Sequence, residues 1–367
     1  MASRILITGA DGFIGRNLGV RLRELGFDPI PVTRRTGDIS SAVADADFVI
    51  HLAGANRPTD PADFMAVNRD VSARLGDAVV VAGRRIPLIF ASTSRALEDS
   101  EYGRSKLAGE AALVAAGAAS GSPVHIFRLP NIFGKWSRPF YNSAVATFCH
   151  NVARNLPIEI HDASSPLRLA YIDDVVSAFA DLIARPDAPG GLHDIIPVYD
   201  TTVGAVADMI RGFRADRGEN LIADVGTGLT RALYATYVSF LPPAEFSYPI
   251  ASHRDPRGAF SEMLKTRTAG QFSYFNALPG VTRGGHYHHT KTEKFLVVHG
   301  RARFRFRHIL SDERHELETS AEEPVVVETI PGWSHDITNI GDEVMVSLLW
   351  ANEIFDRTRP DTMGAPV

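Results

Sequence analysis

Residues 280–300 read GVTRGGHYHHTKTEKFLVVHG, a stretch in which two histidines and a glutamate stand at fixed spacing between two glycines. Because side chains at i and i+2 of a β-strand point to the same face, His286 and His288 should project together, and Glu293 can return on the next strand. Imidazole and carboxylate groups are ligands that zinc and other divalent transition metals take in proteins. The stretch therefore predicts a metal site inside a small β-barrel.

A second stretch supplies a fourth expected ligand: residues 332–335 read GWSH, with Asn339 behind them. The two stretches resemble the two sequence motifs of the cupin superfamily, and the resemblance implies one divalent metal bound by His286, His288, Glu293 and His335. The usual second motif has a residue between proline and glycine, whereas Pro331 and Gly332 are adjacent here. His335 keeps its normal distance from the glycine and stays a ligand. A solvated histidine-rich hairpin is the alternative.

The ligand residues do not by themselves identify the metal ion or the base that moves a proton. Zinc is the expected ion, but the same ligand set in cupins holds iron, manganese or nickel, and residue types alone do not choose. Parity along the strand puts Glu293 and His299 on one face, so His299 is the expected interior base for moving a proton.

Length, charge and cysteine content restrict the class of protein. A chain of 367 residues exceeds what one hydrophobic core usually serves, so two domains are expected. The net charge of −5 gives no basic field for nucleic acid or anionic membrane, so neither is expected as a partner. The single cysteine, Cys149, excludes an internal disulfide, and no stretch approaches the roughly 20 apolar residues of a membrane span. A cytoplasmic protein is expected.

The N-terminal residues 4–8 (RILIT) read as a buried parallel strand that runs into a glycine turn and then a helical pattern. Glycines let the backbone approach a pyrophosphate, whose charge is met by the amide groups at the helix start. Tight turns also collect glycine, which is the alternative. The pattern predicts a dinucleotide site with contacts from Gly9, Gly12, Phe13, Ile14 and Gly15.

The second strand, near residues 28–33, ends in Arg34 and Arg35, where an NAD-selective site would place an acidic residue. A guanidinium pairs well with the 2′-phosphate of NADPH, so NADPH is the expected cofactor, with a solvated loop as the alternative. Further cofactor contacts are expected from Asp38, Ile39, Leu52 and Ala53.

A candidate catalytic group follows in residues 89–94 (IFASTS) and, after a loop, Tyr102 and Lys106. Tyrosine and lysine at i and i+4 share one helix face, where an ammonium can lower the pKa of the phenol. This arrangement resembles the extended class of the short-chain dehydrogenase/reductase family. The resemblance implies Thr93 as the catalytic hydroxyl, with Ser92 and Ser94 as competitors, Tyr102 as the acid/base and Lys106 as its partner, both also touching the cofactor.

The same resemblance implies further site residues. Residues 128–134 (RLPNIFG) resemble the segment that lines the nicotinamide, which places Leu129 at the cofactor. Arg257, in the segment 255–258 (DPRG), is similar to a diphosphate ligand of sugar-nucleotide cupins, or belongs to an ordinary turn. The expected substrate-binding residues are Asn68, Asn131, Arg168 and Arg257. Related 4,6-dehydratases place an Asp-Glu pair after the catalytic threonine; Ser94-Arg95 stands here, which favours reduction over dehydration.

Two prolines, Pro242 and Pro243, mark the expected boundary. Residues 1–243 should form an α/β Rossmann-type doubly wound parallel sheet with a sugar-nucleotide pocket, and residues 244–367 an all-β cupin barrel. In residues 303–307 (RFRFR) the phenylalanines should point inward and the arginines into water; an arginine-lined phosphate pocket is the alternative.

The fusion of the two resembles the CapF/WbjC-type enzymes of capsular and O-antigen polysaccharide synthesis. That resemblance implies that the cupin domain epimerises C3 of a UDP-2-acetamido-2,6-dideoxy-hexos-4-ulose and that the reductase domain reduces its C4 ketone with NADPH to UDP-2-acetamido-2,6-dideoxy-L-talose. A homodimer is expected from cupin habit. Three alternatives stay open: a reductase with the cupin as a metal-stabilised dimerisation module, an iron dioxygenase, and an NADPH-sensing regulator.

Overall fold

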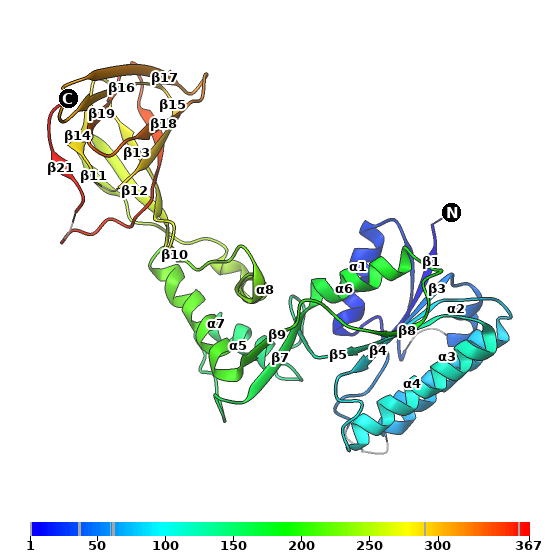
Figure 1. The fold of residues 1–367 in the computed structure, drawn as a ribbon. Helices are drawn as coiled ribbons and strands as arrows, with labels where there is room; N and C mark the ends of the chain where they lie inside the picture. Colours follow the sequence, from blue (N-terminus) through cyan, green and yellow to red (C-terminus); the bar gives the residue numbers. More distant parts are fainter. Residues whose placement is uncertain (1, 36–37, 59, 61–62, 290, 359) are drawn as a thin grey trace. The chain divides into compact units, whose positions relative to one another are not determined.

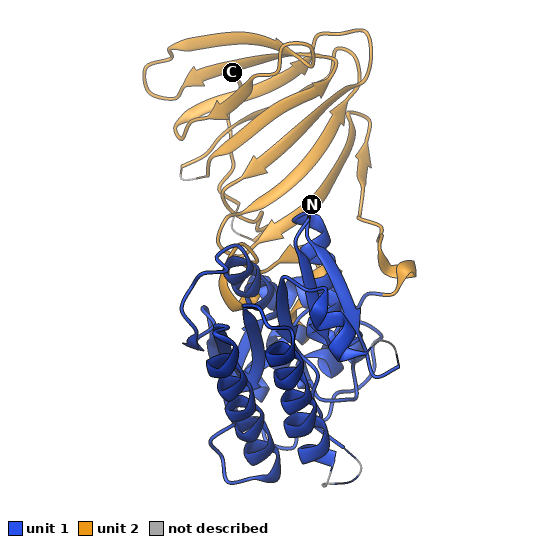
Figure 2. Ribbon diagram, turned by 90° about the vertical axis from the view of Figure 1, so that its right-hand side faces the viewer, with its two compact units in different colours: residues 1–210, 231–241 blue, residues 211–230, 242–367 orange. Residues whose placement is uncertain are grey.

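The computed structural model describes residues 2–35, 38–58, 60, 63–289, 291–358 and 360–367. The chain divides into two compact units, one formed by Met1–Ile210 with Arg231–Leu241 and the other by Arg211–Thr230 with Pro242–Val367 (Figure 2). The expected boundary after Pro243 lies two residues from the break at Leu241, while the contacts place Arg211–Thr230 in the second unit as well.

The first unit is built on a parallel sheet of six strands (Figure 1). Its strands, in spatial order, are β2 (Asp28–Val32), β1 (Arg4–Thr8), β3 (Phe48–His51), β4 (Leu88–Thr93), β5 (Val124–Leu129) and β8 (Gly191–His193). All neighbouring pairs are parallel. The central strands are buried almost throughout, as expected for a sheet covered by helices on both faces.

Helices cover both faces of this sheet. Helices α1 and α6 pack together on one face, and α3 and α4 on the other (Figure 1). The helices of the first unit and its margins are α1 (Phe13–Glu24), α2 (Ile39–Ala44), the π-helix η1 (Met65–Arg69), α3 (Asp70–Val81), α4 (Glu101–Ser120), α5 (Ala144–Val152), α6 (Ile172–Ile183), α7 (Val203–Gly218) and α8 (Gly228–Val238). The α/β doubly wound fold expected for the N-terminal part is thus confirmed.

The first unit also contains a second, small sheet of three strands. It consists of β6 (Asn131–Phe133), β7 (Pro166–Tyr171) and β9 (Tyr199–Thr202). Strands β6 and β7 are parallel, and β9 is antiparallel to β7. Because β6 begins two residues after β5 ends, this sheet continues the chain directly from the carboxyl edge of the large sheet.

The second unit is made mainly of two β-sheets. The first contains β10 (Leu221–Ile222), β12 (Gly258–Thr266), β13 (Gln271–Ala277), β20 (Met345–Ala351), β15 (Glu293–His299) and β18 (Val326–Thr329), with β11 (His253–Asp255) paired to β12. The second contains β17 (Arg314–Ser320), β16 (Arg301–His308), β19 (Trp333–Asn339), β14 (Thr282–Tyr287) and β21 (Met363–Gly364). A short 3-10 helix, η2 (Pro243–Glu245), precedes them.

The core between these sheets is apolar and follows the alternation of the strands. Phe304 and Phe306 are 1% and 6% exposed and pack with Phe275, Phe295 and other core residues. The intervening Arg305 instead pairs with Asp336 through two hydrogen bonds. The expected orientation of the RFRFR strand, with phenylalanines inward, is confirmed, and so is the all-β barrel. Among the helices described, none is long and apolar enough to cross a membrane.

Candidate active site and metal centre

The glycine turn that joins β1 to α1 leaves no room for side chains at Gly9 and Gly15. Gly9 has φ +68°, and a Cβ on it would lie 2.8 Å from the Ala53 backbone nitrogen. A Cβ on Gly15 would lie 2.5 Å from the Gly9 carbonyl oxygen, so the first turn of α1 presses on the loop. Gly12 is the N-cap of α1 and has no side chain to cap it, which leaves the amide groups of the helix start open to a ligand.

The region expected to select NADPH is exposed. Arg34 and Arg35 follow β2, and both side chains face solvent. Asp38 is the N-cap of α2, where its carboxylate accepts hydrogen bonds from the backbone nitrogens of Ser40 and Ser41. Asp38 therefore fixes the start of a helix beside the two arginines, while Leu52 and Ala53 follow the neighbouring β3.

Thr93 and Tyr102 meet at the carboxyl end of β4. The Thr93 hydroxyl acts to lower the pKa of the Tyr102 phenol, and the backbone nitrogen of Arg95 donates to Thr93 Oγ1 at 3.3 Å. Ser92 points to the opposite side, where its buried hydroxyl donates to Glu110 Oε1 at 2.5 Å. Ser94 is exposed. Of the three hydroxyls, the structure brings only that of Thr93 to the tyrosine.

The electrostatics around Tyr102 differ from the expectation that Lys106 lowers its pKa. Burial raises the pKa of Tyr102, while the hydrogen bond to Thr93 and the charge of Arg95 act in the opposite direction. The Lys106 ammonium instead donates to the Ala91 carbonyl oxygen at 2.8 Å. Burial lowers the pKa of Lys106 to about 8, partly offset by the charge of Glu110. The lysine is held one turn below the tyrosine as a buried, easily deprotonated amine.

Asn68 supports the site from the π-helix η1. It is 1% exposed, its amide oxygen accepts from the Ala55 backbone nitrogen, and its amide nitrogen donates to Ser105 Oγ at 2.9 Å. Ser105 lies between Tyr102 and Lys106 on α4. This corrects the expectation that Asn68 contacts a substrate: burial and these bonds make it a brace for the catalytic helix.

A pocket of about 380 Å³ opens beside β6. Asn131 lines it, together with Arg57, Tyr141 and the first residues of α5. Leu167 and Leu169 also line it, so Arg168 between them points to the other face of β7. There its side chain is 66% exposed and pairs with Asp200 at 3.2 Å. The structure thus places Asn131, but not Arg168, in this pocket.

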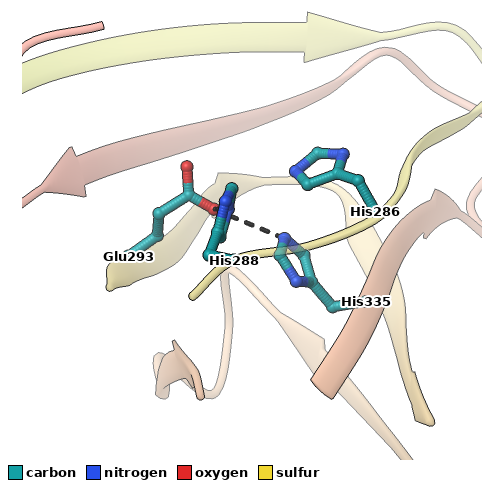
Figure 3. Close-up of side chains that lie close together, drawn as sticks. All are labelled: His286, His288, Glu293 and His335. Carbon is teal, nitrogen blue, oxygen red and sulfur yellow. Dashed lines mark hydrogen bonds and ion pairs between the residues drawn. The ribbon is translucent and has the colours of Figure 1, made fainter. Parts of the chain in front are cut away.

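The four expected metal ligands converge in the second unit (Figure 3). One possible ligand atom from each of His286, His288, Glu293 and His335 lies within 4.8 Å of all the others. Glu293 Oε2 is 3.2 Å from His288 Nε2 and 3.3 Å from His335 Nε2. The three imidazoles and one carboxylate point toward one another from β14, β15 and β19 and the residue after β14.

Local backbone irregularity aims these side chains. Strand β14 has a register shift between Gly284 and His286, and both Gly284 and Gly285 have positive φ. This bulge leaves His286 directly opposite His335 on β19, with ring centroids 4.7 Å apart. The two glycines are therefore required by the backbone that turns His286 into the site.

The protonation states suit a metal. Burial lowers the pKa of His286 to about 4, and the neighbouring rings of His335 and His288 act in the same direction. Burial alone would raise the pKa of Glu293, but hydrogen bonds from the two histidines and the charge of Lys291 hold it well below its usual range. A neutral imidazole and an ionised carboxylate are the ligating forms, so His286 and Glu293 fit a divalent metal.

A second layer of contacts orients the ligands. His288 Nδ1 bonds to the Asp361 carbonyl oxygen, which leaves Nε2 for the metal. The Asp361 carboxylate accepts from the backbone nitrogens of His289 and Lys291 at 2.9 and 2.8 Å. Lys291 Nζ lies 3.2 Å from Glu293 Oε1, and its side chain is 11% exposed. In contrast, His335 Nδ1 is buried without a hydrogen-bond partner in the described part of the chain.

One expectation about this unit is corrected. His299 does not face the barrel interior: a bulge between Val297 and His299 reverses the parity of β15 at its end. The side chain is 57% exposed and lies 3.3 Å from Glu343. The Arg257 guanidinium, 57% exposed, pairs with Asp255 in the same turn at 2.6 Å, and its role as a diphosphate ligand stays a prediction.

The sequence pattern did not predict several residues at these sites. Lys291 carried a usable signal, because it is a basic residue only two positions before the expected ligand Glu293. Asp361 carried none, since about 70 residues separate it from the ligands that it supports. Arg57, which donates to the Tyr141 carbonyl oxygen at 2.9 Å beside the pocket, lies in a loop without a motif.

Comparison with known proteins matches one family model in each unit. Residues 5–195 match the family described as NAD dependent epimerase/dehydratase family, and residues 253–363 match the polysaccharide biosynthesis C-terminal domain. A UDP-2-acetamido-2,6-beta-L-arabino-hexul-4-ose reductase of Pseudomonas aeruginosa is 51% identical over 367 residues, covering 99% of both chains.

Solved structures are similar over the whole chain and over its first part. The capsular polysaccharide assembling protein CapF from Staphylococcus aureus is 39% identical, with a TM-score of 0.91 over 99% of this chain and all of that one. MoeE5 in complex with UDP-glucuronic acid and NAD, at 24% identity and a TM-score of 0.52, covers 56% of this chain and 81% of its own, and shows the fold alone. The chain therefore belongs to the NAD dependent epimerase/dehydratase family, and within it to a CapF-like group.

Proposed function

We propose that the chain is a bifunctional nucleotide-sugar enzyme with one reaction in each unit. The second unit epimerises C3 of UDP-2-acetamido-2,6-dideoxy-hexos-4-ulose, and the first reduces the C4 ketone with NADPH to UDP-2-acetamido-2,6-dideoxy-L-talose. The observation that carries this proposal is the presence of both the Thr93–Tyr102–Lys106 group and the three-histidine, one-glutamate cluster on one chain. The relative of 51% identity, named as a hexul-4-ose reductase, supports the substrate.

The residues of the first unit suit ketone reduction. Thr93 and Tyr102 place two hydroxyls side by side, which can hold the C4 carbonyl oxygen. NADPH supplies the hydride when bound at the glycine turn. Tyr102 then gives its phenolic proton to the oxygen, so the ketone becomes a hydroxyl. Lys106, whose pKa burial lowers to about 8, places a buried positive charge one helical turn from Tyr102.

NADPH is proposed over NADH from the residues after β2. Arg34 and Arg35 are exposed there, and Asp38 is engaged as a helix cap, so the positive charge is available to a 2′-phosphate. Residue 95, where a dehydratase would have an acid, is an arginine whose side chain pairs with Glu98 at 2.8 Å. A base for β-elimination is thus missing at that position, which supports reduction.

The residues of the second unit suit proton exchange next to a ketone. A divalent metal, proposed as zinc, held by His286, His288, Glu293 and His335 would polarise the carbonyl oxygen and so acidify the hydrogen on C3. Inversion at C3 is possible only while the C4 ketone exists, so epimerisation has to precede reduction. Lys291, buried against Glu293, adds a second positive charge at the same place.

Product analysis with matched variants tests this proposal. The wild type, given the UDP-4-ketosugar and NADPH, should form the C3-inverted alcohol. Tyr102→Phe should stop NADPH oxidation, and His288→Ala should stop C3 inversion, whereas His289→Ala, an exposed neighbour outside the cluster, should retain both. If His288→Ala loses stability but still yields the inverted product, the metal site is a structural module and the epimerase assignment is wrong.

A further inference from the structure

A buried histidine, His51, lies behind the reductase site and has no part in the steps above. It ends β3, is fully buried, and stacks on Phe90 with ring centroids 5.2 Å apart. The Lys106 ammonium lies 4.3 Å from the centroid of the same Phe90 ring. Burial, together with the charge of Lys106, lowers the pKa of His51 to about 3. The imidazole is therefore neutral at neutral pH and carries one N–H group.

One nitrogen of His51 leads to the cofactor side. His51 Nδ1 lies 2.6 Å from Thr8 Oγ1, at the end of β1. The same Thr8 oxygen accepts the backbone N–H groups of Leu52 and Ala53, each at 3.2 Å. Leu52 and Ala53 form the stretch expected to touch the cofactor, and Ala53 packs on Gly9 of the glycine turn. This arm therefore holds the backbone around the dinucleotide turn.

The other nitrogen leads to the catalytic helix. His51 Nε2 lies 3.0 Å from Ser72 Oγ, which donates to the Asn68 carbonyl oxygen at 2.6 Å. The Asn68 side chain donates to Ser105 Oγ, and Ser105 donates to the Tyr102 carbonyl oxygen at 2.8 Å. This arm therefore ends on the backbone of the catalytic tyrosine.

The hydrogen bonds fix the tautomer. Ser72 has a single hydroxyl hydrogen, and the Asn68 carbonyl oxygen takes it. Ser72 Oγ must then accept from His51, so the proton of His51 is on Nε2. Nδ1 is left as an acceptor for the Thr8 hydroxyl hydrogen, and every polar group in the chain of bonds is satisfied. The opposite tautomer would give Thr8 Oγ1 three donors and leave its own hydrogen without an acceptor among these contacts.

We propose that His51 is a positioning residue for the reduction, held as the neutral Nε2–H tautomer, whose two nitrogens separately fix the cofactor-contacting backbone and the catalytic helix. This inference rests on the proposed reductase function of the first unit. It assigns opposite tasks to the two ring nitrogens, so the two arms can be cut one at a time.

Two amide substitutions separate the arms. Asparagine matches the position of Nδ1, so His51→Asn keeps an acceptor for Thr8 and loses the donor to Ser72. Glutamine reaches the position of Nε2, so His51→Gln keeps that donor and loses the acceptor. His51→Gln should raise the Kd of NADPH about 10-fold with kcat within about two-fold, and His51→Asn should lower kcat about 10-fold with the Kd within about two-fold.

The tautomer has its own readout in nitrogen-15 NMR of histidine-labelled protein, with the His51 signals identified by their loss in His51→Asn. A protonated Nε2 and an unprotonated Nδ1 at pH 7 are expected. A proton on Nδ1, or two variants that change Kd and kcat alike, would overturn the proposal. If a His51 variant does not fold, Thr8→Val and Ser72→Ala remove the same two sets of contacts. Thr8→Val should then raise the Kd of NADPH, and Ser72→Ala should lower kcat. A wild type that neither binds NADPH nor reduces the ketosugar refutes the proposed function instead, and the NMR result still decides the tautomer.

Discussion

Replacing Asp361 by alanine should weaken metal binding at the four-residue cluster without removing any ligand. The Asp361 carboxylate accepts the backbone N–H groups of His289 and Lys291, and these two residues belong to the loop that joins His288 to Glu293. The backbone carbonyl that holds His288 Nδ1 is kept in the variant. The change therefore removes support for the loop and leaves the ligands in place.

The magnitude follows from the bonds lost. A hydrogen bond of this kind contributes about 1 kcal/mol net, so losing the partner of two backbone donors costs about 2 kcal/mol. Without Asp361 the loop has to be ordered by the metal itself, and the cost falls on binding. Because about 1.4 kcal/mol corresponds to a factor of 10, the metal affinity should fall about 30-fold, within the range seen for second-layer partners of metal ligands.

Competition with a chromogenic chelator measures this affinity directly, on the full chain loaded with zinc. Asp342→Ala, a change at an exposed aspartate elsewhere in the second unit, is the matched control and should bind zinc like the wild type. Equal affinities for Asp361→Ala and the control would refute the reasoning that the loop is held by the Asp361 carboxylate.

Three further results are expected from the first unit. Arg34→Ala should lower the preference for NADPH over NADH by about 10-fold, because a charge-assisted bond to the 2′-phosphate is lost; an unchanged ratio of kcat/KM values for the two cofactors would contradict this. Arg128→Ala should lower the free energy of unfolding by about 3 kcal/mol, and with it the Tm, because it leaves the carboxylate of Glu110, which is 4% exposed, without its bidentate partner. A thermal melt measures this change, and an unchanged Tm would contradict the prediction. Lys106→Met should raise the Tm at pH 7, because the folded-state pKa of Lys106, about 8, lies below the ordinary lysine pKa of 10.5 and the unfolded chain therefore binds the proton more tightly. This penalty is complete below pH 8 and fades as the pH rises toward 10.5, so the difference in Tm should shrink over that window.

The first unit was largely predictable because its signals are local. The strand at residues 4–8, the glycine turn and the helix after it follow one another without a gap, and the structure reproduces them as β1 and α1. Tyr102 and Lys106 are one helical turn apart, so their shared face follows from the helix alone. The choice of Thr93 over Ser92 agrees with strand parity, which sends Ser92 toward Glu110.

The failures come from interactions that the local pattern does not encode. His299 was placed inward by simple alternation, and a single bulge after Val297 moved it to the surface. Arg168 lies beside Asp200 because β7 pairs with β9, a contact that the local pattern does not encode, and its role at the substrate stays a prediction. Asp361 reaches the metal ligands only because β21 pairs with β14, a contact between segments more than 70 residues apart. Such pairings depend on the assembled sheet.

The exchange of the C3 hydrogen with solvent tests the central claim most directly. The UDP-4-ketosugar is incubated with the protein in deuterated water without NADPH, and deuterium at C3 is followed by NMR. The wild type should incorporate deuterium, Tyr102→Phe should do so at the same rate, and His288→Ala should not. Exchange that persists in His288→Ala, or that is absent from the metal-loaded wild type, would contradict the assignment of the epimerisation to the cluster of His286, His288, Glu293 and His335.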